Sequence, residues 1–503
     1  MAKSLVPDYL QGKLQALHPW PAQVDAVPHA AEAKLRTYPS AHRETLVRVL
    51  NAQYQRLGIV APAALKRLAE PRTVTLTTGQ QPGLLGGPLY TLHKAAAVVS
   101  LCRHLNATSK DGLHYVPVFW IAGEDHDSVE INQARVNEVT TVQYSGNLQG
   151  AVGRNLLTEP ITLPQHTMPE VARHWQPGHS WNDAFQRMLA EWFAGTELLV
   201  LNPDEPELKR LFAPVMAQEL AHRPTAPLVN AAGDALRKQG YKVQLHASDV
   251  CLFYLTETER LKLEPSPGGG LDTALHFARP TTQWLDEVNQ HPERFSPNAA
   301  LRPLYQETVL PNAAYVGGAG ELAYWLQLPE VFRHFAVPYP VVLQRPSVLL
   351  VDDAMKQSAQ ALGLTLDNLL APQPHLFRKV AEQEGIWPDT QAHWTKVQNS
   401  LEELHHRLTA ISPTLGRSVR SLQTDIEHRR QRLERRTLQQ LVQTHPRPFQ
   451  EALRLRARLL GARGEPQERH YSVLAFSQTP EEIVQQVLAQ LDPLKAGLQV
   501  VKL

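Results

Sequence analysis

The 503-residue sequence has few cysteines, no excess of charge of either sign and no long apolar run. Its two cysteines, Cys102 and Cys251, occur in no CxxC or Cys/His spacing, which excludes a disulfide framework and a zinc-binding pattern. Fifty Lys and Arg residues balance 49 Asp and Glu residues, so no overall positive field attracts nucleic acid or anionic lipid. Apolar runs such as 348–351 are far shorter than the roughly 20 residues of a membrane span, and the first residues lack the apolar region of a secretory signal. We therefore expect a cytoplasmic protein with no nucleic-acid or membrane partner.

Short apolar or β-branched segments alternate with helical patterns along the first two thirds of the chain. Such alternation predicts a parallel sheet, because parallel strands need helical crossover connections. We therefore predict an α/β fold whose core is a Rossmann-like parallel sheet with inserted connecting segments, followed by a C-terminal α-helical coiled-coil domain. The predicted strands of the core are residues 73–77, 115–122, 198–201, 339–344 and 347–351.

The composition divides the chain into three regions. The core is expected over 1–373, with an N-terminal helical cap, and Pro- and turn-rich insertions are expected near 139–195 and 242–295; residues 242–256 are expected to form a hairpin. A coiled coil is expected over 374–470, with 471–503 returning to the core. Apolar residues from Leu401 to Ile426 hold the three-four spacing of a coiled-coil seam, with a break allowed at Ser412. A helix over 448–460 is expected to return antiparallel, and the length of the seam predicts a homodimer.

A glycine-rich segment follows the first predicted strand. Glycines at the carboxyl end of a strand, just before a helix, let the backbone approach a ligand and direct N–H groups at an anion. The alternative is a turn needed only for close packing of strand and helix. We favour a binding loop because two adjacent glutamines serve no purpose in a core. The candidate residues are Gly79, Gln80, Gln81, Gly87, Tyr90 and Lys94.

An acidic segment, Glu124, Asp125, His126 and Asp127, ends the second predicted strand. In open α/β sheets ligands bind beyond the carboxyl ends of the strands. Carboxylates crowded around an imidazole provide a general base for deprotonating an amine. The spacing matches no metal signature, so we predict no metal site. An N-cap Asp with solvent-facing acids at a helix start is the structural alternative.

A third group of candidate residues combines a glycine-rich turn with charged and aromatic side chains. Arginine suits the recognition of carboxylates because its guanidinium donates two parallel hydrogen bonds. Each residue alone also fits an ordinary ion pair, but several strand or turn ends on one side of a sheet predict a substrate pocket. These candidates are Arg302, Gln306, Tyr315, Gly318, Glu321, Tyr324 and Arg345.

Together these motifs resemble the bacillithiol biosynthesis family of cysteine-adding enzymes. The resemblance rests on Thr-Gly-Gln-Gln-Pro-Gly, on Glu-Asp-His-Asp after an apolar strand and on Gly-Glu-Leu-Ala-Tyr-Trp, in that order between Thr73 and Arg345. It implies a Rossmann-like core, dimerisation through the coiled coil and the joining of cysteine to glucosaminyl-malate. It also implies nucleotide binding (ATP or ADP) near the coiled coil, for which the local candidates are Gln467 and Arg469. The sequence lacks the His-x-Gly-His and Lys-Met-Ser-Lys-Ser signatures of related synthetases.

The main hypothesis is therefore an amide-forming ligase that catalyses the last step of bacillithiol biosynthesis. Asp127 or His126 would accept the amine proton, Lys94 would hold an anion and Arg302 would hold the malyl carboxylate. One alternative is a nucleotidyltransferase or synthetase acting on another amine. The other is a non-catalytic, nucleotide-binding dimeric scaffold of thiol metabolism.

Overall fold

The computed structural model describes residues 3–14, 17–110, 112–165, 167–267, 269–273, 277–461 and 464–503. The chain forms two compact units. Unit 1 contains Met1–Leu349 with Glu468–Val501 and Leu503, and unit 2 contains Leu350–Gln467 with Lys502.

The core of unit 1 is a five-stranded sheet in which every neighbouring pair of strands is parallel. This confirms the predicted Rossmann-like core. Because the strands are parallel, their carboxyl ends lie at one edge of the sheet. The strand order is β11 (Val341–Gln344), β10 (Asn312–Gly317), β1 (Thr73–Gln80), β2 (His114–Ile121) and β5 (Leu199–Leu201).

Two details of the sheet differ from the sequence prediction. β10 is a central strand that the sequence did not predict, since its alanines and glycine give a weak strand signal. Residues 347–351 do form a strand, β12 (Ser347–Val351), but it pairs with β13 (Leu498–Lys502) and does not join the main sheet.

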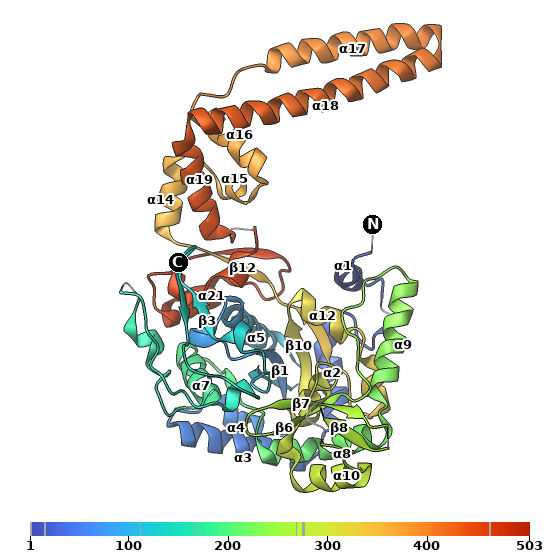
Figure 1. Cartoon of the computed structure of the whole chain (residues 1–503), viewed down its shortest axis with the longest axis vertical. Coiled ribbons are helices and arrows are strands. Elements are labelled where there is room, and N and C mark those ends of the chain that lie inside the picture. The colour runs from blue at the N-terminus through green and yellow to red at the C-terminus, as the bar shows by residue number, and fades with distance from the viewer. Residues whose placement is uncertain are drawn as a thin grey trace. The chain divides into compact units, whose positions relative to one another are not determined.

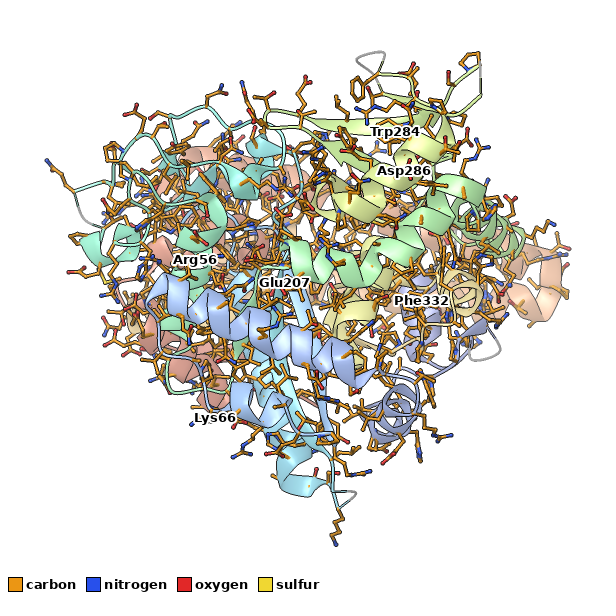
Figure 2. The ribbon with its side chains drawn as sticks, turned by 90° about the horizontal axis from the view of Figure 1, so that it is seen from below. Arg56, Lys66, Glu207, Trp284, Asp286 and Phe332 are labelled. Atoms are coloured by element: carbon orange, nitrogen blue, oxygen red, sulfur yellow. The ribbon has the colours of Figure 1, made fainter. Side chains whose placement is uncertain are left out.

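Helices cover the sheet and connect its strands. α5 (Tyr90–Thr108) links β1 to β2, and every residue from Thr91 to Cys102 is buried, so the helix lies inside the unit. α3 (Ser40–Leu57) and α8 (Pro206–His222) pack against each other, with Arg56 and Glu207 on their outer surfaces (Figure 2). The other α-helices among the described residues up to 240 are α1 (Leu5–Leu10), α2 (Val27–Leu35), α4 (Ala64–Leu68), α6 (Ser128–Ile131), α7 (Trp181–Trp192) and α9 (Thr225–Lys238).

The inserted segments form small antiparallel sheets. β3 (Gln133–Arg135) pairs with β4 (Thr141–Gln143), and a four-stranded sheet has the order β8 (Leu271–Thr273), β7 (Arg260–Pro265), β6 (Leu252–Leu255), β9 (Phe295–Pro297). The hairpin predicted over 242–256 is therefore wrong, because only β6 within that range is a strand and its hairpin partner is β7. α10 (Thr281–Gln290) lies between β8 and β9, and α11 (Arg302–Val309), α12 (Ala319–Trp325) and α13 (Pro329–His334) come after β9.

Unit 2 is helical, and its longest helices form an antiparallel pair (Figure 1). The helix is interrupted at Ser412. α17 (Gln391–Ile411) ends before it, and the Ser412 hydroxyl caps α18 (Pro413–Thr444). This confirms the predicted coiled coil, but its returning helix is α18 and not the segment 448–460. That segment lies in α19 (Pro446–Leu459), which packs with α14 (Asp353–Ala361), α15 (Leu366–Leu370) and α16 (Gln373–Gln383).

Two short helices, α20 (Gln467–His470) and α21 (Pro480–Gln490), precede β13. In the described part of the chain, no helix is both long and apolar enough to cross a lipid bilayer.

Candidate functional site

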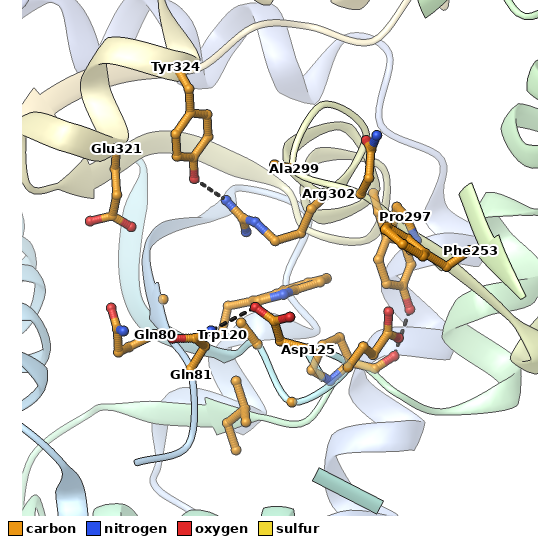
Figure 3. A pocket seen from close by; sticks show the side chains of 18 of the residues that line it. Gln80, Gln81, Trp120, Asp125, Phe253, Pro297, Ala299, Arg302, Glu321 and Tyr324 are labelled. Carbon is orange, nitrogen blue, oxygen red and sulfur yellow. Dashed lines mark hydrogen bonds between the residues drawn. The ribbon is translucent and has the colours of Figure 1, made fainter. Parts of the chain in front are cut away.

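A cavity of about 550 Å³ lies at the carboxyl ends of β1, β2 and β10 (Figure 3). One part of its lining comes from the sheet and the helices that follow it, and the other part comes from the loop after β5 and from the inserted segments. The sheet, α11 and α12 supply Gly79, Gln80, Gln81, 120–125, Arg302, Tyr305, Tyr315, Glu321 and Tyr324. The remaining lining residues are Pro203, Leu245, His246, Phe253, Arg260 and 297–299.

The cavity brings together candidates from all three sequence motifs. Those that line it are Gly79, Gln80, Gln81, Glu124, Asp125, Arg302, Tyr315, Glu321 and Tyr324. Lys94, Tyr90, Gln306 and Gly318 do not line it but hydrogen-bond to residues that do. His126, Asp127, Gly87, Arg345, Gln467 and Arg469 are not among its lining residues.

Lys94 lies behind the wall of the cavity. Its ammonium group is 3.0 Å from the carbonyl oxygen of Gly79, 2.7 Å from Gln80 Oε1 and 2.7 Å from Glu321 Oε2. An ammonium group has three donors, so these contacts use all of them. Burial lowers the pKa of Lys94, and the carboxylate of Glu321 opposes that shift. Lys94 therefore fixes Gln80 and Glu321 in place.

Glu321 is held from several directions at the start of α12. Its Oε1 accepts a hydrogen bond of 2.5 Å from the Tyr315 hydroxyl, and its Oε2 accepts one of 2.9 Å from the backbone N–H of Gly318. Burial favours a higher pKa for Glu321, but the charge and hydrogen bond of Lys94, together with the other donors, lower it below the usual value. Glu321 is thus an ionised, fixed wall of the cavity.

Arg302, at the first position of α11, reaches into the cavity on the opposite side from Gln81 and Asp125 (Figure 3). It donates to the Tyr324 hydroxyl at 2.9 Å and to Gln306 Oε1 at 3.2 Å. A guanidinium has five N–H donors, so donors remain for a ligand. Arg302 is therefore the cationic group suited to bind a carboxylate here.

The two carboxylates of the turn after β2 have different surroundings. Glu124 forms an ion pair with the fully buried Lys209 of α8 and accepts a 2.7 Å hydrogen bond from Ser296 Oγ. The Asp125 side chain is 41% exposed; its Oδ2 accepts a 2.7 Å hydrogen bond from Gln81 Nε2, and its Oδ1 lies 3.6 Å from Arg260. Asp125 is therefore the carboxylate of this turn that a substrate can reach.

A group of charged side chains, most of them buried, lies behind Glu124. Lys209 also donates to the carbonyl oxygen of Phe295 at 2.7 Å. Asp204, in the loop after β5, accepts two hydrogen bonds from Arg154 at 2.6 and 2.7 Å. Although burial favours a higher pKa for Asp204, Arg154 lowers it below the usual value. These pairs fix the position of Glu124 because a displaced member would leave a buried charge unpaired.

His126 and Asp127 do not line the cavity, although His126 Nδ1 lies 3.4 Å from Asp125 Oδ1. Asp127 caps the short helix α6 (Ser128–Ile131), its carboxylate accepting a 3.3 Å hydrogen bond from the N–H of Glu130. The His126 side chain is 58% exposed, and its Nδ1 lies 3.3 Å from Arg260. Asp127 is thus the N-cap of a helix, as in the alternative interpretation of this acidic segment. Among the described residues, no group of three or more His, Cys, Asp or Glu side chains is placed to hold a metal ion.

Most of the glycine-rich loop is packed against protein. Leu85 and Gly86, in the 3₁₀ turn Leu84–Gly86, have φ values of 51° and 90°. A Cβ on Gly86 would overlap the ring of Trp192, and one on Gly83 would lie 2.7 Å from the Cα of Gly87. The tight turn therefore needs these glycines for packing, whereas Gly79 also lines the cavity.

Arg345 and Gln467 form internal contacts. Arg345 is buried and makes two hydrogen bonds, of 2.9 and 2.8 Å, to the Glu468 carboxylate, which also lies 3.0 Å from His93 Nδ1. Burial favours a higher pKa for Glu468, but His93 and Arg345 lower it strongly. In unit 2, the Gln467 amide accepts from the Leu350 N–H at 2.8 Å and donates to two carbonyl oxygens at 3.0 Å.

Comparisons with known proteins agree with this architecture. The family model "Bacillithiol biosynthesis BshC, N-terminal Rossmann-like domain" matches residues 2–346, and "Bacillithiol biosynthesis BshC, C-terminal coiled-coil domain" matches residues 348–503. The chain belongs to the BshC family.

Relatives from several bacteria match this BshC family member over most of their length. A Salinibacter ruber protein is 33% identical, covering 87% of this chain and 84% of its own. A Cytophaga hutchinsonii protein is 30% identical, covering 98% of this chain and 95% of its own. A Symbiobacterium thermophilum protein is 32% identical, covering 81% of this chain and 80% of its own. Each of these relatives is named "Putative cysteine ligase BshC".

A second cavity in unit 1, of about 310 Å³, contains the remaining candidate, Arg469. Arg135 and His470 also line it, and they lie 3.3 Å apart. Tyr90 lines the same cavity, and its hydroxyl lies 3.4 Å from Gln80 Nε2, which belongs to the first cavity. Two arginines and an imidazole make this second cavity suited to an anion, although Glu130 also lines it.

Proposed function

We propose that the chain is a cytoplasmic ligase that joins the carboxyl group of cysteine to the amine of glucosaminyl-malate. The observation that supports this proposal is which of the three carboxylates in the cavity are already paired with a lysine. Glu124 and Glu321 are each paired with a buried lysine, whereas Asp125 is partly exposed and faces Arg302 across the cavity (Figure 3). An amine and a carboxylate can therefore be held on opposite sides of one site.

In this proposal Asp125 takes the role of general base. The amine nitrogen attacks the activated carboxyl carbon, the new C–N bond forms, and the C–O bond to the activating group breaks. The proton released by the nitrogen passes to Asp125, whose position is set by Gln81. Arg302 holds a substrate carboxylate through its remaining donors. The geometry favours Asp125 over Asp127 and His126, which do not line the cavity.

We also propose that a nucleotide binds at the second cavity. Arg469 and Arg135 would hold its phosphates, whereas Gln467 has its amide groups engaged with backbone. Bound ATP would supply the phosphoryl or adenylyl group that activates a carboxyl group for amide formation. The contact between Tyr90 and Gln80 connects the linings of the two cavities.

The ligation is tested with the purified chain, cysteine, glucosaminyl-malate and ATP, with mass spectrometry of the thiol product. We expect product from the wild type and its loss in Asp125→Asn, with Asp127→Asn retaining turnover. Asp286→Asn is the matched control, because Asp286 is an exposed aspartate of α10 outside the cavity (Figure 2). Absence of product from the wild type would contradict the proposed function, and full turnover of Asp125→Asn would contradict the role of Asp125.

A further inference from the structure

The segment 244–247, between α9 and β6, is held by side-chain amides. Gln327 Oε1 accepts from the N–H groups of Gln244 at 3.1 Å and Leu245 at 2.8 Å, and Gln327 Nε2 donates to the Leu245 carbonyl oxygen at 2.8 Å. Asn230 makes two 3.3 Å hydrogen bonds, to the N–H and the carbonyl oxygen of Ala247. The two amides thus replace the neighbouring strand that this segment lacks.

Gln327 connects this segment to the elements of the site. It is fully buried and follows α12, the helix that carries Glu321 and Tyr324. Asn230 belongs to α9. Because a buried amide with three hydrogen bonds has little freedom to move, the position of the segment is set by the same helix that forms the cavity wall.

His246 lies between the two clamped residues and lines the cavity. Its side chain is exposed, and within the described ranges its imidazole makes no hydrogen bond or ion pair. In contrast, Gln81 and Asp125 bond each other, and Arg302 bonds Tyr324. An imidazole both donates and accepts hydrogen bonds, so a substrate can supply both missing partners.

We infer that His246 is a substrate-binding residue of this cavity, which hydrogen-bonds the amine-bearing substrate, and that Gln327 and Asn230 are its positioning residues. This inference rests on the proposed function. The inserted segments place His246 in one lining with the half-buried ring of Phe253 and the amide of Asn298. The Arg260 guanidinium lies over the Phe253 ring, 3.8 Å from its centroid, so this part of the lining combines apolar surface with hydrogen-bonding groups. Such a lining suits a hydroxylated ring, the part of the substrate that carries the amine. Arg260 of the same inserted sheet contacts Asp125, the proposed acceptor of the amine proton.

The test measures steady-state kinetics with glucosaminyl-malate and cysteine varied in turn. His246→Ala should raise KM for glucosaminyl-malate about tenfold, the loss of one good hydrogen bond, and leave KM for cysteine and the melting temperature nearly unchanged. His246→Gln, which keeps a donor and an acceptor, should recover part of the loss. Asn230→Ala should raise the same KM by a smaller factor. His291→Ala is the matched control, because His291 is not among the lining residues.

Calorimetric binding of glucosaminyl-malate to the intact protein separates this inference from the proposed function. Tighter binding by the wild type than by His246→Ala supports the inference, even if the wild type forms no product and the proposed ligation is thereby overturned. Equal binding and equal KM in the two proteins would overturn the role of His246. A wild type that does not bind the compound would overturn both.

Discussion

Lysine and glutamate pairs determine which side chains of the cavity are available for chemistry. Lys94 and Lys209 each neutralise one glutamate, and both lysines are almost completely buried. Removing one member of such a pair, or its charge, leaves the other charge buried and unpaired, which costs free energy. These pairs are therefore suited to fixing the geometry of the cavity and not to proton transfer. Asp125, which is held by an amide and by a more distant arginine, is the carboxylate that we propose for proton transfer.

Substitution of Gln81 tests whether Asp125 must be held in place. Gln81→Ala removes the 2.7 Å hydrogen bond to Asp125 from a partly buried side chain. We expect product formation to fall by at least about tenfold, while the free energy of unfolding changes by no more than roughly 1 kcal/mol. Turnover assays and urea denaturation measure the two quantities, and turnover at the wild-type rate would show that Gln81 has no part in the reaction.

Glu307 is predicted to make stability depend on pH at a place outside the cavity. Burial raises the pKa of Glu307 to about 7, against the opposing effects of Lys34, Asn312 and Gln306. Since the unfolded value is about 4.3, the folded protein holds more protons between these two values. The stability that comes from protonated Glu307 is fully present below about pH 4.3 and is lost as the pH rises through about 7.

Glu307→Gln removes this titration and keeps an acceptor for Asn312. We therefore expect the free energy of unfolding of the wild type, relative to the variant, to fall by roughly 3 kcal/mol between pH 4.5 and pH 7.5. Urea denaturation of both proteins across this range measures the difference. Parallel curves for the two proteins would contradict the raised pKa of Glu307.

At the scale of the elements, sequence patterns predicted the segments whose signal is local. β1 and β2 are buried on both faces, so each is a continuous apolar or β-branched run, and the polar residues at their carboxyl ends stand out. β10 has a weaker pattern, which does not predict a strand. The segment 244–247 alternates in sequence like a strand but is held by side-chain amides, which depend on contacts between residues far apart in the chain.

The same difference explains which site residues the sequence could predict. Gln81 and Asp125 follow adjacent strands, so the rule for parallel sheets places them together. Lys209 lies within a helix, and Arg260 and His246 lie in insertions, where no local motif distinguishes them from surface residues. Asp127 is only two residues from Asp125 in sequence, but its side chain caps a helix. Which of the two carboxylates lines the cavity depends on how the turn folds.

The glycine-rich loop provides a test at the scale of the element. Gly86→Ala adds a Cβ that overlaps the Trp192 ring at a residue with φ of 90°. We expect a loss of about 1 to 3 kcal/mol of folding free energy from this overlap and backbone strain, with the turnover of the folded fraction nearly unchanged. Thermal denaturation with turnover per folded molecule measures both. A loss of turnover without a loss of stability would instead place Gly86 in the binding site.

At the scale of the whole molecule, α17 and α18 leave apolar side chains exposed. No residue of α17 is fully buried, and Ile411 is 73% exposed. On α18 the exposed fractions are 40% for Leu415, 45% for Leu422 and 55% for Leu433. A two-helix pair has no second layer to cover such residues, so we propose that the helix pair of a second copy covers them in a homodimer.

Leu415→Glu combined with Leu422→Glu tests this dimer. Both leucines are exposed on the chain itself, so the pair of helices should still form, whereas two carboxylates buried between copies would cost several kcal/mol. We expect light scattering to show a dimer for the wild type and a monomer for the double variant, with equal helical content by circular dichroism. Thr424→Glu with Gln431→Glu is the matched control, because it adds the same charge with the same seven-residue spacing at exposed positions on the opposite face of α18. If the leucine variant remains a dimer, Leu415 and Leu422 are not covered by the second copy. The contact between copies then lies on another surface.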